Sequence, residues 1–361
     1  MTGWQKMLAS DITNVASRHA IQLRALPGAA EHTNKIRQKF TTVLTRELDG
    51  NIPPDLDVVL LGSFGRSEVT AESDCDYLLL LRATPPPEDI KRVFQAVEST
   101  RESLELGEAG RTGTFGDFVT ATELFARIGL ESDSNANTTR RLLLLSESVS
   151  ALDANVTNGI KQAILRRYLG DYAPEMQREK AVHVPHFLLN DLTRYWRTIA
   201  VDFGAKQWRA LSRDWYLRYA KLLTTRKVLF AGTLAVLLDT ANALDHFYAE
   251  GPVDQAAVFE ALNEHLRLGL QRSPLARLME LHDRLEAEGG IALANLLRAY
   301  DRFIEMLDDS PTRAALKGAG TAGIEARQEV EELGRVIHDS LLVVFNDDPL
   351  LRSAMRQYAV F

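Results

Sequence analysis

The spacing of apolar residues divides the chain into a mixed first part and a helical second part. Apolar runs at 55–61, 76–82 and 115–120 are bounded by turn residues and predict three β-strands. Helical spacing around them predicts helices at 1–26, 31–49, 88–105, 122–128 and 137–149. After residue 155 the strand signals stop. We therefore expect an α+β fold, with a small mixed-sheet domain and flanking helices followed by an all-helical C-terminal domain.

The helical second part contains several predicted helices in succession. Their expected ranges are 155–170, 185–204, 208–223, 225–250, 253–269, 274–308 (broken at Gly289-Gly290) and 322–345. The resulting domain prediction is 1–52 for N-terminal helices that pack on the catalytic domain, 53–153 for the α/β domain and 154–361 for the helical domain. The segment from Gly318 to Gly323 spells G-x-G-x-x-G without a preceding strand, so we interpret it as a flexible connection.

Two aspartates introduce the candidate chemistry. Asp74 and Asp76 are two positions apart at the start of a predicted strand, so both carboxylates face the same side, while Cys75 faces the other. Two neighbouring carboxylates in apolar surroundings are costly unless a cation neutralises them, and Mg²⁺ (or Mn²⁺) suits oxygen ligands of this kind. Upstream, the Gly62-Ser63 turn offers N–H groups and a hydroxyl to phosphates. The pattern is typical of a metal-dependent enzyme that acts on a nucleoside triphosphate.

The same residues carry a family resemblance. Residues 62–68 read GSFGRSE and residues 73–76 read SDCD, a pattern that resembles the DNA polymerase β-type nucleotidyltransferase superfamily. Within it, the PII uridylyltransferases and the glutamine synthetase adenylyltransferases are the most similar in motif. The resemblance implies a nucleotidyltransferase domain whose active site faces a helical domain. It also implies a third carboxylate on a later strand.

Further candidates complete the expected site. Asp117, in the third predicted strand, is the candidate for the third metal-binding and catalytic carboxylate, although an edge strand also carries charges against edge pairing. Arg66 is expected to reach the phosphates, or else to pair with Glu68 or Glu72. In the helical part we assign substrate binding to Asn190 and Arg194, on one polar helix stripe, and to Lys221 as a triphosphate clamp. Arg277 and His282 match a loose R-x₄-H ribonuclease pattern, which we interpret as a chance match.

Composition limits the partners. The net charge of −7 gives no global basic field for nucleic acid, and a nucleic-acid partner is not expected. One cysteine, no signal-peptide pattern and no long apolar run predict a cytoplasmic protein without a membrane span. The expected partners are an NTP (ATP or UTP) and a protein hydroxyl as acceptor. Two alternatives stay open: synthesis of a small or cyclic oligonucleotide signal, and a regulatory protein that senses a nucleotide without turning it over.

Overall fold

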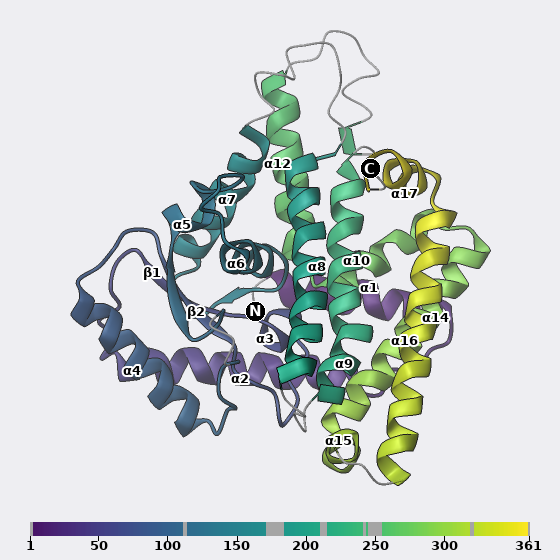
Figure 1. Cartoon of the computed structure of the whole chain (residues 1–361), viewed down its shortest axis with the longest axis horizontal. Coiled ribbons are helices and arrows are strands. Elements are labelled where there is room, and N and C mark those ends of the chain that lie inside the picture. Colours follow the sequence, from purple (N-terminus) through teal and green to yellow (C-terminus); the bar gives the residue numbers. More distant parts are fainter. Residues whose placement is uncertain are drawn as a thin grey trace. The chain divides into compact units, whose positions relative to one another are not determined.

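The chain forms a mainly helical α/β protein with a small mixed sheet (Figure 1). The computed structural model describes residues 3–110, 114–170, 184–209, 215–240, 243–244, 255–317 and 321–359. The chain divides into two compact units: an α/β unit, Gly28–Gly170, and a helical unit made of Met1–Pro27 with Asp171–Phe361. Among the described helices, none combines the length and the apolar character that crossing a membrane requires.

The sheet has four strands in the order β3-β2-β1-β4. Its strands are β1 (Leu56–Leu60), β2 (Tyr77–Leu81), β3 (Asp117–Thr120) and β4 (Val149–Ser150). β1 runs antiparallel to both β2 and β4, whereas β2 and β3 are parallel. The helices of this unit are α2 (Leu26–Glu47), α3 (Ser63–Arg66), α4 (Pro87–Ser103), α5 (Ala121–Phe125), α6 (Asn135–Ser146) and α7 (Ala154–Gly170).

Alternation along the strands assigns each side of the sheet to different helices. Val58 and Leu60 of β1, with Tyr77 and Leu79 of β2, belong to one buried cluster together with apolar residues of α2 and α4. The residues between them project from the other side, where α7 contacts β1, β2 and β4 and α5 contacts β3. Both central strands are therefore buried on two sides, which explains their nearly continuous apolar sequences.

A buried carboxylate anchors α7 to the sheet. Asp57, in the middle of β1, is fully buried. Its Oδ1 accepts hydrogen bonds from the backbone N–H groups of Leu152 (2.9 Å) and Asp153 (3.0 Å), and its Oδ2 accepts one from Thr157 Oγ1 (2.5 Å). Burial raises the pKa of Asp57, although the hydrogen bonds that it accepts act in the opposite direction.

The helical unit consists of α-helices with short 3₁₀ and π segments. They are α1 (Gly3–Arg18), α8 (His186–Arg209), α9 (Trp215–Leu223), α10 (Thr225–Leu238), α12 (Gln255–Gln271), α13 (Pro274–Glu280), η1 (Leu281–Arg284), α14 (Ala287–Asp308), α15 (Ser310–Lys317), α16 (Thr321–Asp347), α17 (Pro349–Ala354) and η2 (Met355–Ala359). α14 and α16 form the most extensive helix pair, and α10 packs on α13. Glycines mark close crossings: a Cβ on Gly232 of α10 would lie 2.3 Å from the Pro274 carbonyl oxygen.

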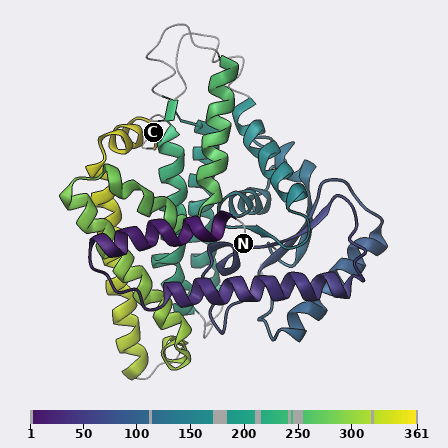
Figure 2. The same ribbon diagram turned by 180° about the vertical axis from the view of Figure 1, so that it is seen from behind.

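The unit boundaries differ from the domain boundaries expected from the sequence. α1 belongs to the helical unit, where its apolar side, with Ile12 and Val15 buried, contacts α13 and α14 (Figure 2). α7, which was expected to open the helical domain at residue 154, belongs to the α/β unit because it covers the sheet.

Two local expectations also need correction. The helix expected to end near residue 149 ends at Ser146, and the chain then extends into β4, where Ala151 N–H donates to the Val58 carbonyl. The break expected at Gly289-Gly290 lies earlier, at η1, and α14 runs through both glycines. Gly289 is needed there for close packing, because a Cβ on it would lie 2.3 Å from Asp347 Oδ2.

Replacing a glycine at a helix crossing should separate two helices. We expect Gly232→Ala to lower the free energy of unfolding by about 1–3 kcal/mol, since the added methyl meets the Pro274 backbone. Gly159→Ala in α7 is the matched control: Gly159 is exposed with no neighbour within 4 Å, so the better helix propensity of alanine should raise stability by up to about 1 kcal/mol. Urea denaturation of both variants measures the contrast, and equal effects would contradict it.

Asp57 should make stability depend on pH in a defined direction. Because its pKa is raised above the ordinary 3.8, the folded protein holds this proton more tightly than the unfolded chain does. The stabilisation is therefore complete below pH 3.8 and is lost as the pH rises through the raised pKa. Asp57→Asn keeps an acceptor without the charge, so its stability relative to the wild type should improve as the pH rises above 3.8 and through the raised pKa of Asp57.

Asp57→Ala is the contrasting variant. It leaves two backbone N–H groups without their acceptor and should lower the free energy of unfolding by at least about 2 kcal/mol at every pH. Urea denaturation at several pH values compares all three proteins. A wild-type profile parallel to that of Asp57→Asn would contradict the pH prediction.

Candidate active site of the α/β unit

The Gly-Ser turn lies directly beside one of the two aspartates. After β1 the chain turns at Gly62, which has a positive φ of 63° and precedes the short helix α3. A Cβ on Gly62 would lie only 3.2 Å from Asp76 Oδ2. Ser63, half-buried, begins α3, and the first turn of any helix leaves N–H groups without intrahelical acceptors. The turn that leads into Ser63 and the first N–H groups of α3 therefore lies beside the Asp76 carboxylate.

The two aspartates project away from the core. Asp74 is exposed and Asp76 is half-buried, whereas Cys75 and Tyr77 lie in the buried cluster, as strand alternation predicts. Burial, with the nearby Asp76 charge, raises the pKa of the Cys75 thiol to about 12, so Cys75 is a core residue rather than a nucleophile. Asp76 Oδ1 accepts a hydrogen bond of 2.9 Å from the backbone N–H of Gly110.

Asp117 lies on the same side of the sheet but is already paired. The parallel register sets it beside Leu78, two positions beyond Asp76. Its Oδ2 accepts a hydrogen bond of 2.6 Å from Arg140 Nη2, and its Oδ1 accepts one of 2.8 Å from the N–H of Phe118. Among the residues that the structure describes, no three His, Cys, Asp or Glu side chains form a group that could hold a metal ion. The expected set of three carboxylates is therefore not assembled in this structure.

Arg66 pairs with carboxylates rather than pointing to an open phosphate site. Its Nε donates to Glu68 Oε2 over 2.7 Å, and its Nη1 donates to Glu147. The three side chains are 13%, 5% and 5% exposed, so the triad is largely removed from water. Of the two roles considered for Arg66, ion pairing with Glu68 is the one observed, and Glu147 is an additional partner.

Sequence reasoning missed two residues that position the turn. Glu147 ends α6, and its backbone lies so close to Gly65 that a Cβ there would fall 1.7 Å from its carbonyl oxygen. Arg37, on α2, donates to the Phe64 carbonyl of α3 and to the Ser67 hydroxyl (3.1 Å). Burial lowers the pKa of Arg37 to about 10. No local motif marks either residue, because both act through contacts distant in sequence.

The remaining substrate-binding candidates belong to the helical unit. Asn190 and Arg194 lie on α8, outside the core that Leu189 and Leu192 enter; Asn190 is exposed, and Arg194 forms a 3.9 Å ion pair with Asp191. Lys221 is half-buried on α9, a helix that contacts α8. These positions agree with a polar stripe on α8. All three belong to the helical unit, whereas Asp76 belongs to the α/β unit.

Other sequence candidates have structural roles. Trp215 stacks on Tyr219 with centroids 5.5 Å apart, and Tyr219 on Phe203 at 5.7 Å, so these rings pack α8 against α9. His282 Nε2 lies 2.8 Å from His19 Nε2, whereas Arg277 donates to the Gly269 and Leu270 carbonyls at the end of α12. The two residues of the R-x₄-H pattern thus contact different groups: Arg277 the end of α12, and His282 the imidazole of His19. Of the G-x-G-x-x-G segment, residues 318–320 lie outside the described residues, and α16 begins at Thr321.

The Arg66 triad yields a direct test of its role. Arg66→Ala leaves two nearly buried carboxylates without their cation, so we expect it to lower the free energy of unfolding by about 3–5 kcal/mol. Adding Glu68→Gln and Glu147→Gln should recover most of that loss. Urea denaturation without nucleotide measures both. A fully stable Arg66→Ala protein that only loses NTP affinity would instead make Arg66 a phosphate ligand.

Comparison with known proteins supplies no family. No protein-family model matches the chain, and no curated protein matches it either. The candidate site therefore rests on its own geometry and on the motif at residues 62–76.

Proposed function

We propose that this protein is a Mg²⁺-dependent nucleotidyltransferase that transfers a nucleoside monophosphate from an NTP to a hydroxyl acceptor and releases pyrophosphate. The observation that carries the proposal is the contact between Gly62 and Asp76, where a Cβ would lie 3.2 Å from the carboxylate. It sets a phosphate-binding turn beside a potential metal ligand. The exposed Asp74, two positions earlier, adds a second carboxylate at the same edge.

The donor set fits a divalent cation. Asp74 and Asp76 would hold the ion, and Mg²⁺ commonly takes one or two carboxylates with substrate phosphates and water in its other positions. When bound, the ion would neutralise charge on the phosphates and on the attacking oxygen. Asp117 would complete a third carboxylate position only after leaving Arg140, which now binds its Oδ2 at 2.6 Å.

The side chains and N–H groups of the turn contribute positioning. Ser63 and the first N–H groups of α3 would donate hydrogen bonds to the phosphates, and the Gly110 N–H fixes Asp76 Oδ1 at 2.9 Å. The acceptor oxygen forms a bond to the α-phosphorus as the bond to the bridging oxygen breaks, and pyrophosphate leaves. The acceptor proton passes to a carboxylate, for which Asp117 is the candidate. Positioning and charge neutralisation supply most of such catalysis.

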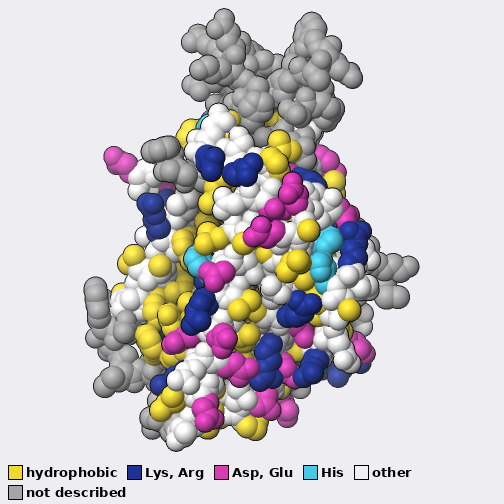
Figure 3. Space-filling view, turned by 90° about the vertical axis from the view of Figure 1, so that its right-hand side faces the viewer, with side chains coloured by type: hydrophobic (Ala, Val, Ile, Leu, Met, Phe, Trp, Pro, Cys, Tyr) yellow, Lys and Arg dark blue, Asp and Glu magenta, His cyan; other side chains and the backbone are white. Residues whose placement is uncertain are grey.

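The proposed acceptor is a hydroxyl of a protein side chain, and the proposed donor is ATP or UTP. Support comes from the motif resemblance to protein-modifying nucleotidyltransferases and from the net charge of −7. Figure 3 shows a face on which Lys and Arg are interspersed with Asp and Glu rather than gathered into a basic stripe.

Replacing either aspartate should abolish transfer without unfolding the protein. We expect Asp74→Asn and Asp76→Asn to lower the rate of label transfer from α-³²P-labelled ATP or UTP by at least about 100-fold. Each variant would lose a carboxylate that holds the metal ion, and with it the neutralisation of the phosphate charge. Asp49→Asn is the matched control: Asp49 is exposed at a φ of 51°, a conformation that asparagine also adopts. Circular dichroism checks the fold of each variant.

The same assay separates the alternatives. Each of the four NTPs is incubated with the wild type in Mg²⁺ or Mn²⁺, with and without a lysate as source of acceptor proteins. Label on a protein supports the proposed acceptor, while a nucleotide product from NTP alone would indicate an oligonucleotide synthase. Binding by calorimetry without pyrophosphate release in either metal would overturn the enzyme and leave a nucleotide-sensing protein.

A further inference from the structure

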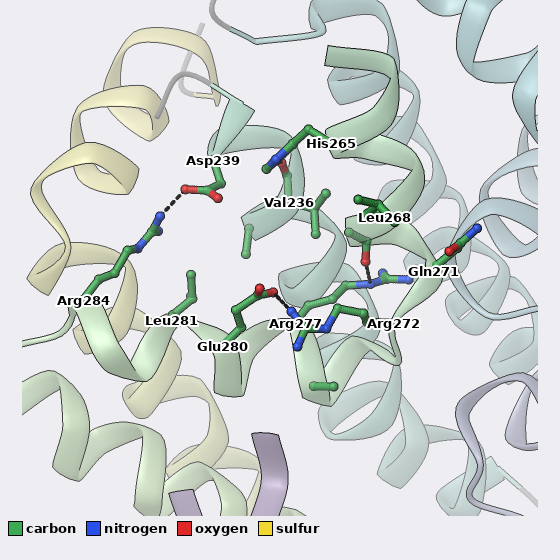
Figure 4. A pocket seen from close by; sticks show the side chains of 13 residues that line it. Val236, Asp239, His265, Leu268, Gln271, Arg272, Arg277, Glu280, Leu281 and Arg284 are labelled. Atoms are coloured by element: carbon green, nitrogen blue, oxygen red, sulfur yellow. Dashed lines mark hydrogen bonds and ion pairs between the residues drawn. The ribbon is translucent and has the colours of Figure 1, made fainter. Parts of the chain in front are cut away.

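A pocket of about 690 Å³ opens within the helical unit, among α10, α12, α13 and η1 (Figure 4). Interiors of proteins are close-packed, and few voids exceed the size of a water molecule. A hollow of this volume falls instead in the range of small-molecule sites, about 300–1,000 Å³. We propose that it is a binding site for an uncharged small molecule with a largely apolar body.

The surface of the pocket wall is mainly apolar. Val236 of α10, Leu268 of α12, Ala276 of α13 and Leu281 of η1 contribute aliphatic groups from four different elements. Leu268 lines this hollow and is 50% exposed, so a ligand in the pocket would cover it. Covering it would stabilise the complex by removing apolar surface from water.

Four of the five Asp, Glu and Arg side chains that line the pocket pair with one another. Arg284 pairs with Asp239 at one end and Arg272 with Glu280 at the other, as the dashed lines in Figure 4 show. Each guanidinium also pairs with a carboxylate that does not line the pocket: Arg284 with Asp348, and Arg272 with Asp11. A charged ligand would have to break one of these pairs and lose its own hydration, which is costly. This excludes phosphates and nucleotides in favour of a neutral molecule.

The third arginine of the pocket stabilises a helix end. Arg277 is 1% exposed and donates to the carbonyls of Gly269 (3.1 Å) and Leu270 (2.7 Å) and to Thr233 Oγ1 (2.8 Å). A cation bonded to the last carbonyls of α12 offsets the negative end of the helix dipole. Arg277 therefore holds α10, α12 and α13 around the hollow and keeps its shape before any ligand arrives.

Two further polar side chains on α12, His265 and Gln271, also line the pocket. An imidazole and a carboxamide can each donate or accept a hydrogen bond. They give a neutral ligand one or two polar contacts for orientation, while the aliphatic wall supplies the buried area. The expected ligand is thus an apolar ring or chain that carries a hydroxyl, amide or carbonyl group.

A pair of fluorescent probes tests both the site and its charge preference. N-phenyl-1-naphthylamine is neutral, and 8-anilino-1-naphthalenesulfonate has the same rings with an added sulfonate. Titration of the full chain should show saturable binding of the neutral probe at one site. The sulfonate probe should bind at least tenfold more weakly, because the guanidinium groups are already paired. Tighter binding of the sulfonate probe would overturn the proposal that the ligand is uncharged.

A Leu268→Trp variant tests whether the neutral probe binds in this pocket. The larger side chain at a half-exposed position should fill the hollow without disturbing the core, and should weaken the neutral probe at least tenfold. Leu342→Trp, at a 47% exposed position of α16 outside the pocket, should leave binding unchanged. Thermal unfolding verifies that both variants fold, and His265→Trp on the same wall replaces Leu268→Trp if that variant does not. Unchanged binding in a folded pocket variant would overturn the site.

Discussion

The candidate active site depends on how closely the chain approaches itself at Gly62 and Gly65. At Gly62 there is room for hydrogen but little for a methyl group, because Asp76 Oδ2 would lie 3.2 Å from a Cβ. At Gly65 there is no room at all, since the Glu147 carbonyl oxygen would lie 1.7 Å away. The turn is thus held between the start of β2 and the end of α6. Sterics, rather than any single hydrogen bond, therefore fix the backbone of this turn beside the carboxylate of Asp76.

Arginines in both units serve the fold through the same physical means. Arg66 neutralises two nearly buried carboxylates, Arg37 reaches the carbonyl end of α3, and Arg277 bonds to the carbonyl end of α12. In each case a guanidinium fork donates to several oxygens at once and ties separate elements together. A cation near a motif is therefore weak evidence for a phosphate contact until its partners within the chain are known.

Local patterns in the sequence predicted the elements well and their long-range partners poorly. The three longer strands and most helices follow apolar spacing, and the burial of Cys75 between two aspartates follows strand alternation. The two-residue strand β4 has no such pattern, because β1 alone defines it. Likewise, the start of α2 is set by Asp301, which accepts hydrogen bonds from Ala25 and Leu26 N–H groups across more than 270 residues. Such partners are fixed by tertiary packing, which a spacing rule does not contain.

The discontinuous helical unit has a consequence for the order in which the protein is made. His19, at the end of α1, meets His282, which is synthesised 263 residues later. At about 5–20 residues per second, α1 waits roughly 13 to 50 s for that partner, with Ile12 and Val15 not yet covered. The α/β unit, complete at Gly170, can fold during this interval. Synthesis therefore favours a sheet that forms first and a helical unit that closes last, around a helix that is made before the sheet.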